Sequence, residues 1–345
     1  MLGARFRLNP NLPDYYVQSA ERVTRYLKFD KVRDDSESHA MPLDTTIAQL
    51  FAKMAAAGRP ALSAGSPQDA RDMTAATRAA LGKGPDIHQV KDLTIPTRAG
   101  SIAARLLMPS AEVKGLIVYL HGGGWVIGTI DDFDAMARAL AKRSECAVLM
   151  PDYRLAPEHP FPAGINDTED AIVWASENMK DLVGAMAPLL VGGDSAGGNL
   201  AAVATHSLLG RVAIKGQLLI YPVTDHNFNT ESYQNYSDGM QLTKRDMQWF
   251  FEHYAPASLH GDPKISPMAQ QKIEGLPRTV VLTSEYDVLR DDGELYAKKL
   301  ISAGVPVITR RIAGLPHGFI RLYNIVEAAD QAMTTIAQDV HTLLQ

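Results

Sequence analysis

The sequence predicts an α/β fold in which a mostly parallel sheet is covered by helices on both faces and carries a helical cap. Three observations predict it. Short apolar runs typical of strands alternate with helical patterns from residue 87 to the carboxyl terminus. Residues 1–85 show helical spacing only. Residues 224–257 interrupt the alternation with a segment rich in Asn, Tyr and Ser.

The composition is that of a large globular protein. The chain of 345 residues exceeds one average domain, so we expect one large domain with a small addition. Apolar residues make up 46% and charged residues 21%, which argues against disorder. The net charge of −5 is spread without long like-charge blocks, so nucleic acid and anionic membranes are poor partners and neutral small molecules are better ones.

The sequence indicates a cytoplasmic protein with no membrane span, because no apolar run is long enough for a signal peptide or a spanning helix. Cys146 is the only cysteine, which rules out an internal disulfide, and its apolar neighbours predict a buried structural thiol. We expect neither a metal nor another cofactor, because no cluster with metal-ligand spacing is present.

Three helices are predicted in the amino-terminal part, over residues 15–29, 43–57 and 66–81, where apolar positions recur every three or four residues. The third helix has a clear start signal. Ser66 can cap it, Pro67 suits the first helical position, and Asp69 places a carboxylate near the positive end of the helix.

The alternating part predicts eight strands and five helices that follow or separate them. The helices are expected over residues 131–143 and near Asp167, Ala196, Asp291 and Ile325. The strands are expected over residues 90–95, 102–108, 115–120, 147–150, 189–192, 217–221, 279–283 and 305–310.

A cap is expected from two separate parts of the chain. Within the insertion, residues 242–254 have helical spacing and Thr243 can cap this helix. With the amino-terminal helices it can cover the carboxyl ends of the strands, where open α/β sheets bind ligands. The predicted division is 1–85 (largely cap), 86–223 (first part of the core), 224–260 (cap insertion) and 261–345 (second part of the core).

A serine stands at a predicted strand–turn–helix junction. Gly193 and Gly197 lie two positions either side of Ser195, after an apolar strand and before a good helix. Glycines there allow a strained turn that projects the serine oxygen at the positive end of the helix. This pentapeptide is a weak signal alone and needs a histidine and a carboxylate to activate the hydroxyl.

Both partners occur downstream at strand ends. Asp287 follows the strand over 279–283 and His317 follows the apolar run over 305–312. The order Ser, Asp, His is that of α/β-hydrolases and excludes a chymotrypsin-like protease, in which histidine and aspartate precede the serine. Three carboxylates compete with Asp287 for the orienting role, and of these we expect Asp291 to cap the next helix; the three are Glu285, Asp291 and Asp292.

A glycine loop follows the strand over 115–120. His121 is followed by three glycines and Trp125, and consecutive glycines allow main-chain amides to approach a substrate oxygen. Donors from this loop and the amide of Ala196 would form an oxyanion hole. The alternative is a plain turn or a phosphate loop, but the spacing matches neither a P-loop nor a dinucleotide site. We expect His121 to fix the loop's shape and Asp194 to form structural hydrogen bonds.

Five motifs together resemble the bacterial hormone-sensitive-lipase family of α/β-hydrolases. They are HGGGW at 121–125, DYRLAPEHPFPA at 152–163, GDSAGGN at 193–199, DVLRDDG at 287–293 and HGF at 317–319, and the resemblance runs from about residue 43 to the carboxyl terminus. It implies an α/β-hydrolase fold, oxyanion donors at Gly123, Gly124 and Ala196, and activity on short- to medium-chain esters. Asp292 departs from the family's usual glutamate, which puts the shape of the cap in doubt.

Other residues are given supporting roles. The proline-rich segment over 153–163 is expected to form a rigid scaffold, in which Arg154 and Glu158 can pair. Aromatic residues of the glycine loop and cap are more often core than ligand-binding. Of these, Trp125 and Phe250 are the candidates for contact with the substrate.

The sequence therefore predicts a carboxylic ester hydrolase with the triad Ser195, Asp287 and His317, acting through an acyl-enzyme on a small-molecule ester. An amidase or arylformamidase with the same machinery is the nearest alternative. A hormone-receptor-like binding protein is the alternative from another class, and the intact His317 argues against it. Whether the chain forms a homodimer stays open.

Overall fold

The computed structural model describes residues 41–345, and an eight-stranded sheet runs through this part of the chain. The strand order is β1-β2-β4-β3-β5-β6-β7-β8. β2 is antiparallel to both of its neighbours and the other pairs are parallel. The strands are β1 (Gln89–Thr97), β2 (Gly100–Met108), β3 (Leu116–Leu120), β4 (Ala147–Pro151), β5 (Leu189–Asp194), β6 (Ile214–Ile220), β7 (Arg278–Tyr286) and β8 (Val307–Pro316). The predicted mostly parallel sheet is confirmed.

The central strands are apolar along their whole length because both faces of the sheet are covered. Every residue of β3, β4 and β5 is buried, which is the pattern of a parallel strand between two helical layers. β1, at the sheet edge, is exposed at most of its positions. The alternation of strand-like and helical runs in the sequence reflects this arrangement.

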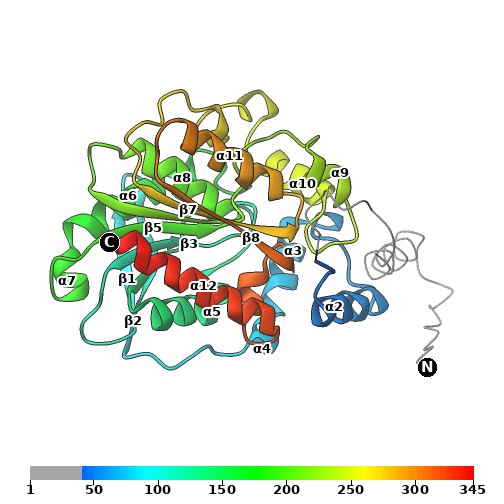
Figure 1. Ribbon diagram of the computed structural model, residues 1–345, viewed down its shortest axis with the longest axis horizontal. Coiled ribbons are helices and arrows are strands. Elements are labelled where there is room, and N and C mark those ends of the chain that lie inside the picture. Colours follow the sequence, from blue (N-terminus) through cyan, green and yellow to red (C-terminus); the bar gives the residue numbers. More distant parts are fainter. Residues whose placement is uncertain (1–40) are drawn as a thin grey trace.

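Two helical layers cover the sheet (Figure 1). One face carries α6 (Ala163–Glu177), α8 (Ala196–Ser207) and α11 (Arg290–Ser302). The other face carries α5 (Ile130–Ser144) and α12 (Glu327–Leu344), which pack against each other. Four further short helices are α7 (Met179–Val183), η2 (Ala257–Leu259), η3 (Pro267–Ala269) and η4 (Phe319–Leu322).

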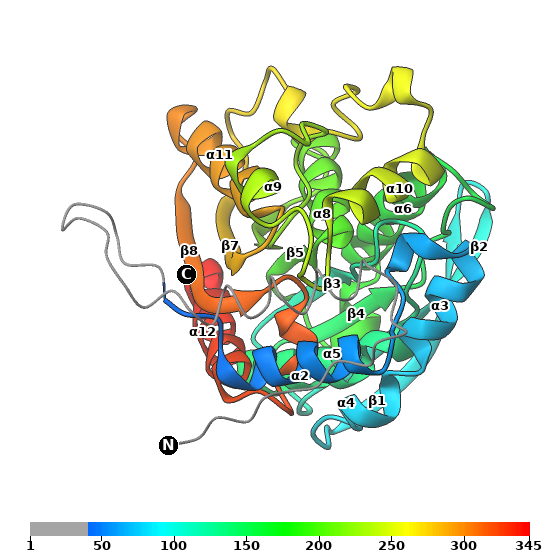
Figure 2. The ribbon, with the colours of Figure 1, turned by 90° about the vertical axis from the view of Figure 1, so that its right-hand side faces the viewer.

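The amino-terminal helices lie at the end of the sheet where the parallel strands finish (Figures 1 and 2). They are α2 (Thr45–Ala56), η1 (Leu62–Ala64), α3 (Pro67–Ala75) and α4 (Arg78–Leu81). The predicted start of α3 is confirmed, since Ser66 and Asp69 form a reciprocal capping box and Pro67 is the first helical residue. The helix expected over 15–29 lies outside the described residues.

The single helix expected over residues 66–81 is interrupted. α3 ends at Ala75 and α4 begins at Arg78. Between them the hydroxyl of Thr77 donates to the carbonyl of Thr74, at 2.7 Å. Such a local side-chain bond competes with the helical ladder between the two helices.

The insertion after β6 also lies at this end of the sheet (Figure 2). It contains α9 (Glu231–Asn235) and α10 (Lys244–Tyr254). Thr243 is confirmed as the N-cap residue of α10: Thr243 and Asp246 form a second reciprocal capping box. α10 turns its aromatic residues inward, and Trp249, Phe250 and Phe251 are all buried.

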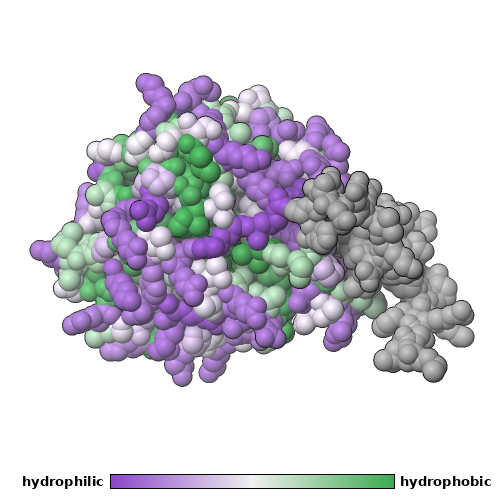
Figure 3. Space-filling model, in the orientation of Figure 1, coloured by the Kyte–Doolittle hydropathy of each residue, from purple (hydrophilic) through white to green (hydrophobic). Residues whose placement is uncertain are grey.

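The described surface is mostly polar on the face of Figure 3, with apolar residues in small separate groups. Among residues 41–345, no helix combines the length and hydropathy needed to cross a membrane.

Cys146 is buried as expected. Its burial raises the pKa of the thiol to about 11.

Candidate active site

Ser195 lies at the sharp turn between β5 and α8. Its backbone has φ 56° and ψ −120°, outside the regions that non-glycine residues favour. The flanking glycines are required by close packing. A Cβ on Gly197 would lie 1.9 Å from the carbonyl oxygen of Leu120, and one on Gly193 would lie 2.5 Å from the same atom. The tight approach of α8 to β3 thus holds the serine at the tip of the turn.

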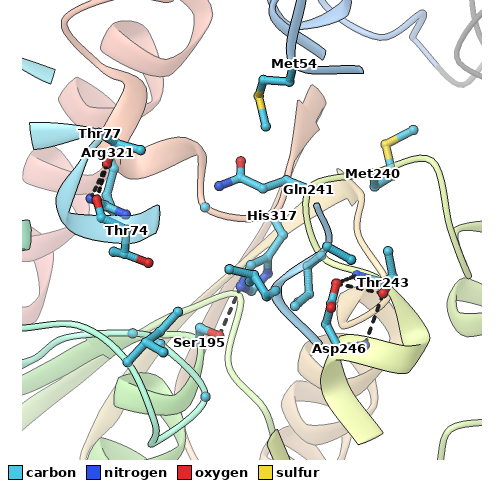
Figure 4. Close-up of a pocket in the computed structure, with 18 of the residues that line it drawn as sticks. Met54, Thr74, Thr77, Ser195, Met240, Gln241, Thr243, Asp246, His317 and Arg321 are labelled. Atoms are coloured by element: carbon cyan, nitrogen blue, oxygen red, sulfur yellow. Dashed lines mark hydrogen bonds between the residues drawn. The ribbon is translucent and has the colours of Figure 1, made fainter. Parts of the chain in front are cut away.

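Ser195, His317 and Asp287 form a continuous hydrogen-bonded chain (Figure 4 shows the first link). The Nε2 atom of His317 lies 3.0 Å from the Oγ atom of Ser195. Its Nδ1 atom lies 2.7 Å from Oδ2 of Asp287. Because a carboxylate can only accept here, Nδ1 carries the proton and Nε2 is left free to accept the serine proton. The geometry is that of a general base next to a nucleophile.

The two downstream residues follow neighbouring parallel strands. Asp287 comes directly after β7 and His317 directly after β8. The carboxylate of Asp287 is fully buried, and its Oδ1 atom accepts the amide of Leu289 at 2.9 Å. This bond and the burial fix the carboxylate in the orientation that receives the imidazole.

The three competing carboxylates are engaged elsewhere. Glu285 accepts the amides of Met41 and Gly314. Asp292 accepts two amides after β6. The prediction that Asp291 caps α11 is wrong: it lies in the first turn of that helix, and its carboxylate accepts the amide of Ser232 at 2.8 Å. The sequence could not show this partner, which belongs to α9.

The glycine loop is folded so that a side chain would not fit. Gly123 has φ 124°, and a Cβ on it would lie 2.1 Å from the carbonyl oxygen of Ile127. Gly124 has φ 57°, and a Cβ there would strike the ring of Phe250 at 2.2 Å. Within residues 41–345 no acceptor lies in hydrogen-bond range of the Gly123 and Gly124 amides. Ala196 is the first residue of α8, so its amide lacks an intrahelical acceptor.

Two polar residues brace this loop as expected. Asp194 is buried; its Oδ1 atom accepts the Tyr119 hydroxyl and the Gly122 amide, both at 3.0 Å. Burial raises the pKa of its carboxyl, against these two hydrogen bonds. The Nδ1 atom of His121 contacts the carbonyl of Gly122 at 2.7 Å, and the ring stacks on Tyr153. In the described part of the chain, no cluster of three potential metal ligands is present.

The two aromatic candidates occupy different positions. Phe250 lines the pocket above Gly124. Trp125 lies outside the pocket lining; its ring is buried and stacks on Tyr254, with centroids 4.3 Å apart. Trp125 therefore belongs to the packing behind the loop, and the expected substrate contact does not fit its position.

The expected ion pair between Arg154 and Glu158 is wrong. Arg154 instead forms a bidentate pair with the buried carboxylate of Asp167, at 2.8 and 2.9 Å. Glu158 pairs with Arg71 of α3, which lowers the pKa of Glu158 to about 2. Arg71 also donates to the carbonyl of Val126, at 2.9 Å, so it ties α3 to the end of the glycine loop.

A cavity of about 310 Å³ opens above Ser195 and His317 (Figure 4). Apolar side chains from α2 and from the insertion form much of its lining, among them Phe51, Met54 and Met240. Figure 4 shows Thr74, Thr77 and Arg321 on one side of the serine–histidine pair, and Thr243 and Asp246 on the other.

Sequence reasoning missed several residues around the site. Tyr221 packs beside the imidazole of His317, with ring centroids 4.5 Å apart. Tyr119 supports Asp194, and Arg321 lines the cavity. The two tyrosines stand in strand-like runs where they resemble ordinary core residues. Arg321 stands only four positions after His317, and this proximity was the available signal.

Comparisons with known proteins point to hydrolytic relatives. The model of the family described as alpha/beta hydrolase fold matches residues 117–321. A carboxylic ester hydrolase (LipN) of Mycobacterium tuberculosis is 42% identical over 253 residues, which are 70% of this chain and 67% of that protein. An ethyl acetate hydrolase of Pseudomonas putida is 34% identical, over 74% of this chain and 84% of that protein.

Solved structures agree with these relatives. An esterase of Pyrobaculum calidifontis superposes with a TM-score of 0.82 at 36% identity, over 88% of this chain and 99% of that one. A thermostable esterase of Pseudomonas putida gives a TM-score of 0.83 at 32% identity, over 90% of this chain and 99% of that one.

Proposed function

The chain belongs to the α/β-hydrolase family, among the bacterial esterases related to hormone-sensitive lipase, and from this premise we propose that Ser195, His317 and Asp287 are its catalytic triad. The protein is a carboxylic ester hydrolase, and its substrates are small-molecule esters. The observation that carries the proposed triad is the unbroken hydrogen-bonded chain from the serine hydroxyl through the imidazole to a buried carboxylate.

The proposed reaction is a two-step acyl transfer. His317 takes the proton of Ser195 as its Oγ atom attacks the ester carbonyl, and the carbonyl oxygen becomes negatively charged. The amides of Gly123, Gly124 and Ala196 donate to this oxyanion. His317 then gives the proton to the departing alcohol, which leaves an acyl-enzyme on Ser195.

The second step reverses the roles of the same groups. His317 takes a proton from a water molecule, which attacks the acyl-enzyme and releases the carboxylic acid from Ser195. Asp287 keeps the proton on Nδ1 and stabilises the imidazolium that forms in each step. Because Asp287 is buried, solvent screens this interaction little.

The proposed cap combines residues 41–85 with the insertion at 224–260, and the core comprises residues 86–223 and 261–345. α2, η1 and α10 all contribute to the cavity lining, which supports this division. Residues of the cap, together with core residues such as Phe133 and Arg321 that also line the cavity, would then determine which acyl and alcohol groups fit. Phe250 is the proposed substrate contact of the insertion.

The test is Ser195→Ala with p-nitrophenyl butyrate as substrate. We expect kcat to fall by several orders of magnitude while the circular dichroism spectrum is unchanged, because the nucleophile is lost and the packing is not. Ser302→Ala is the matched control, since Ser302 is an exposed serine at the end of α11. Retained hydrolysis by Ser195→Ala would overturn the triad.

Two further measurements separate the alternatives. A fluorophosphonate should label the wild type and not Ser195→Ala, whereas a pure binding protein would not react. Butyryl p-nitroanilide, compared with the matched ester, measures selectivity for esters over amides. We expect the ester to be cleaved much faster, in line with the ester-hydrolysing relatives.

A further inference from the structure

Arg321 brings an uncompensated positive charge to the wall of the cavity. It lies on η4, four residues after His317, and lines the same cavity. Its Nη2 atom donates to the hydroxyl of Thr77 at 3.1 Å, and its guanidinium lies 4.9 Å from the centre of the Phe133 ring. Its Nε atom is buried and has no hydrogen-bond partner.

Arg59 brings a second cation to this cavity. It follows α2, and its contact through Nη1 is with the sulfur of Met54, at 4.0 Å. Burial lowers the pKa of the Arg59 guanidinium. Burial also lowers the pKa of Arg321; the charges of Asp132 and Asp194 oppose this effect, and repulsion by Arg59 adds to it. Neither guanidinium forms an ion pair with a carboxylate of residues 41–345.

The other arginines show how unusual these two are. Within residues 41–345, the arginines with no carboxylate within 4.0 Å are Arg59, Arg211, Arg278 and Arg321. Arg211 and Arg278 are exposed, so water solvates their charge. Arg59 and Arg321 are partly buried, and both line the cavity above Ser195.

The carboxylates of this region are already engaged. Asp132, whose charge acts on Arg321, pairs with Arg78 at 2.7 Å. Asp194 accepts the hydroxyl and the amide that brace the glycine loop. Asp246 accepts hydrogen bonds from the amide of Ser63 and from the amide and hydroxyl of Thr243. None of the three is free to neutralise the two arginines.

We propose that the natural substrates are anionic esters, with a carboxylate at the end of one limb that binds Arg321 and Arg59. This inference rests on the proposed function, because the ester carbonyl must lie at Ser195. The carboxylate would occupy the side of the cavity where Arg321, Thr77 and Thr74 lie (Figure 4). A planar guanidinium matches the two oxygens of a carboxylate, and a partly dry site strengthens the pair.

A singly charged carboxylate fits this site better than a phosphate. The cavity of about 310 Å³ must also hold the reacting ester, and much of its lining is apolar. The donors available for an anion are the two guanidinium groups, because the hydroxyls of Thr74 and Thr77 already donate to the carbonyls of Ala70 and Thr74. A dianion would lose more hydration on entering and would have the same few donors to replace it.

The experiment compares charged and neutral esters of equal length with purified enzyme. One pair tests the acyl limb, monoethyl adipate against ethyl hexanoate. The other tests the alcohol limb, 5-acetoxypentanoate against pentyl acetate. We expect kcat/KM to favour the charged member by about tenfold or more in at least one pair, because a charge-assisted hydrogen bond in a desolvated site has this effect.

Substitution then assigns the preference to the arginines. Arg321→Gln should lower the charged-to-neutral ratio of kcat/KM by about tenfold, and Arg321→Lys should lower it less. Arg98→Gln is the control, since Arg98 lies in the turn between β1 and β2 and pairs with Asp170. If Arg321→Gln does not fold, Arg59→Gln takes its place.

The outcomes distinguish the two proposals. Turnover of the neutral esters with no preference for the charged member in either pair overturns the anionic substrate and leaves the triad intact. A preference that Arg321→Gln and Arg59→Gln both leave unchanged overturns it too. Failure to hydrolyse any of the four esters would overturn the proposed function itself, and this inference with it.

Discussion

Backbone strain is concentrated at Ser195 and at residues near it. Non-glycine residues with positive φ in the described part of the chain are Trp125, Glu145, Ser195 and Tyr221. Glu145 caps α5, where a left-handed residue is ordinary. The other three surround the site, and each such conformation costs on the order of 1–3 kcal/mol. The surrounding packing offsets this cost and holds the serine exposed to the cavity.

Gly123 allows a direct test of the glycine loop. We expect Gly123→Ala to reduce kcat by at least about 100-fold, because the new Cβ would meet the Ile127 carbonyl at 2.1 Å and displace an oxyanion donor. Gly100→Ala is a close control: Gly100 has φ 126°, against 124° for Gly123, but a Cβ there meets nothing within 4 Å. The measurement is kcat with p-nitrophenyl butyrate, together with the melting temperature of both variants.

The control separates backbone strain from steric displacement. Gly100→Ala should lose about 1 kcal/mol of stability and keep its activity, since it strains only the turn between β1 and β2. Equal loss of activity in both variants would show that general destabilisation, and not the loop's shape, limits the reaction.

Single residues also show what the sequence can and cannot predict. Ser195, His317 and Asp287 stand at strand ends, and the topology of a parallel sheet brings strand ends together, so their order and the motifs around them predicted that the three side chains would meet. The partner of Arg154 was missed because Asp167 and Glu158 are equally available in the sequence. Only the packing of α6 against the segment after β4 decides between them.

At the scale of elements, one carboxylate joins the two cap segments. Asp246 closes the capping box of α10 and also accepts the amide of Ser63, at 2.9 Å. Ser63 belongs to η1, which lies 183 positions earlier in the chain. The sequence predicted the helix and its cap from local signals. It could not predict the second bond, since nothing local marks Ser63 as a partner.

We therefore expect Asp246→Ala to loosen the cap. It should raise hydrogen exchange in both η1 and α10 and increase KM for p-nitrophenyl butyrate by several-fold, because the cavity loses a fixed wall. Asp69→Ala removes the matching residue of the exposed α3 capping box. Asp69→Ala should lower the free energy of unfolding by about 1 kcal/mol, as expected for the loss of one helix cap. Hydrogen exchange should become faster in α3 alone. Unchanged exchange in η1 of Asp246→Ala would contradict the coupling.

On the scale of the whole molecule, the sheet separates two apolar cores. One lies under α6, α8 and α11, and the other under α5 and α12. The alternating sequence predicted both layers, because strands buried on two faces are apolar throughout. The cavity and its charges arise where the cap meets the strand ends. They depend on contacts between distant segments, which explains why Arg59 and Arg321 were missed.

Asp292 of α11 lies at a contact between distant segments, because it binds the start of the insertion after β6. Burial of its carboxyl affects the stability of the whole fold. Its side chain is 2% exposed, and its Oδ2 atom accepts the amides of Thr224 and Asp225, both at 3.2 Å. Its Oδ1 atom has no partner. Burial raises the pKa of this carboxyl well above its ordinary value, and nearby carboxylates add to the effect.

The direction of the pH effect follows from proton binding. Below the ordinary carboxyl pKa of about 4, the folded and unfolded chains both hold the proton, and the ionisation of Asp292 makes no contribution to the free energy of unfolding. As the pH rises above that value, the unfolded chain releases the proton while the folded protein retains it. The contribution of Asp292 to the free energy of unfolding therefore falls with rising pH until its folded-state pKa is passed.

Asp292→Asn removes this dependence, since asparagine is neutral and keeps an oxygen that can accept both amides. We expect the variant to match the wild type near pH 4 and to be more stable by on the order of 1 kcal/mol or more near pH 7. Asp92→Asn should trend the opposite way and more weakly, because the bond from Arg105 lowers the pKa of the exposed Asp92. Urea unfolding of all three proteins across this range measures both trends. A pH-independent difference between Asp292→Asn and the wild type would show that the Asp292 carboxyl has the same pKa in the folded and the unfolded chain, which contradicts the raised pKa.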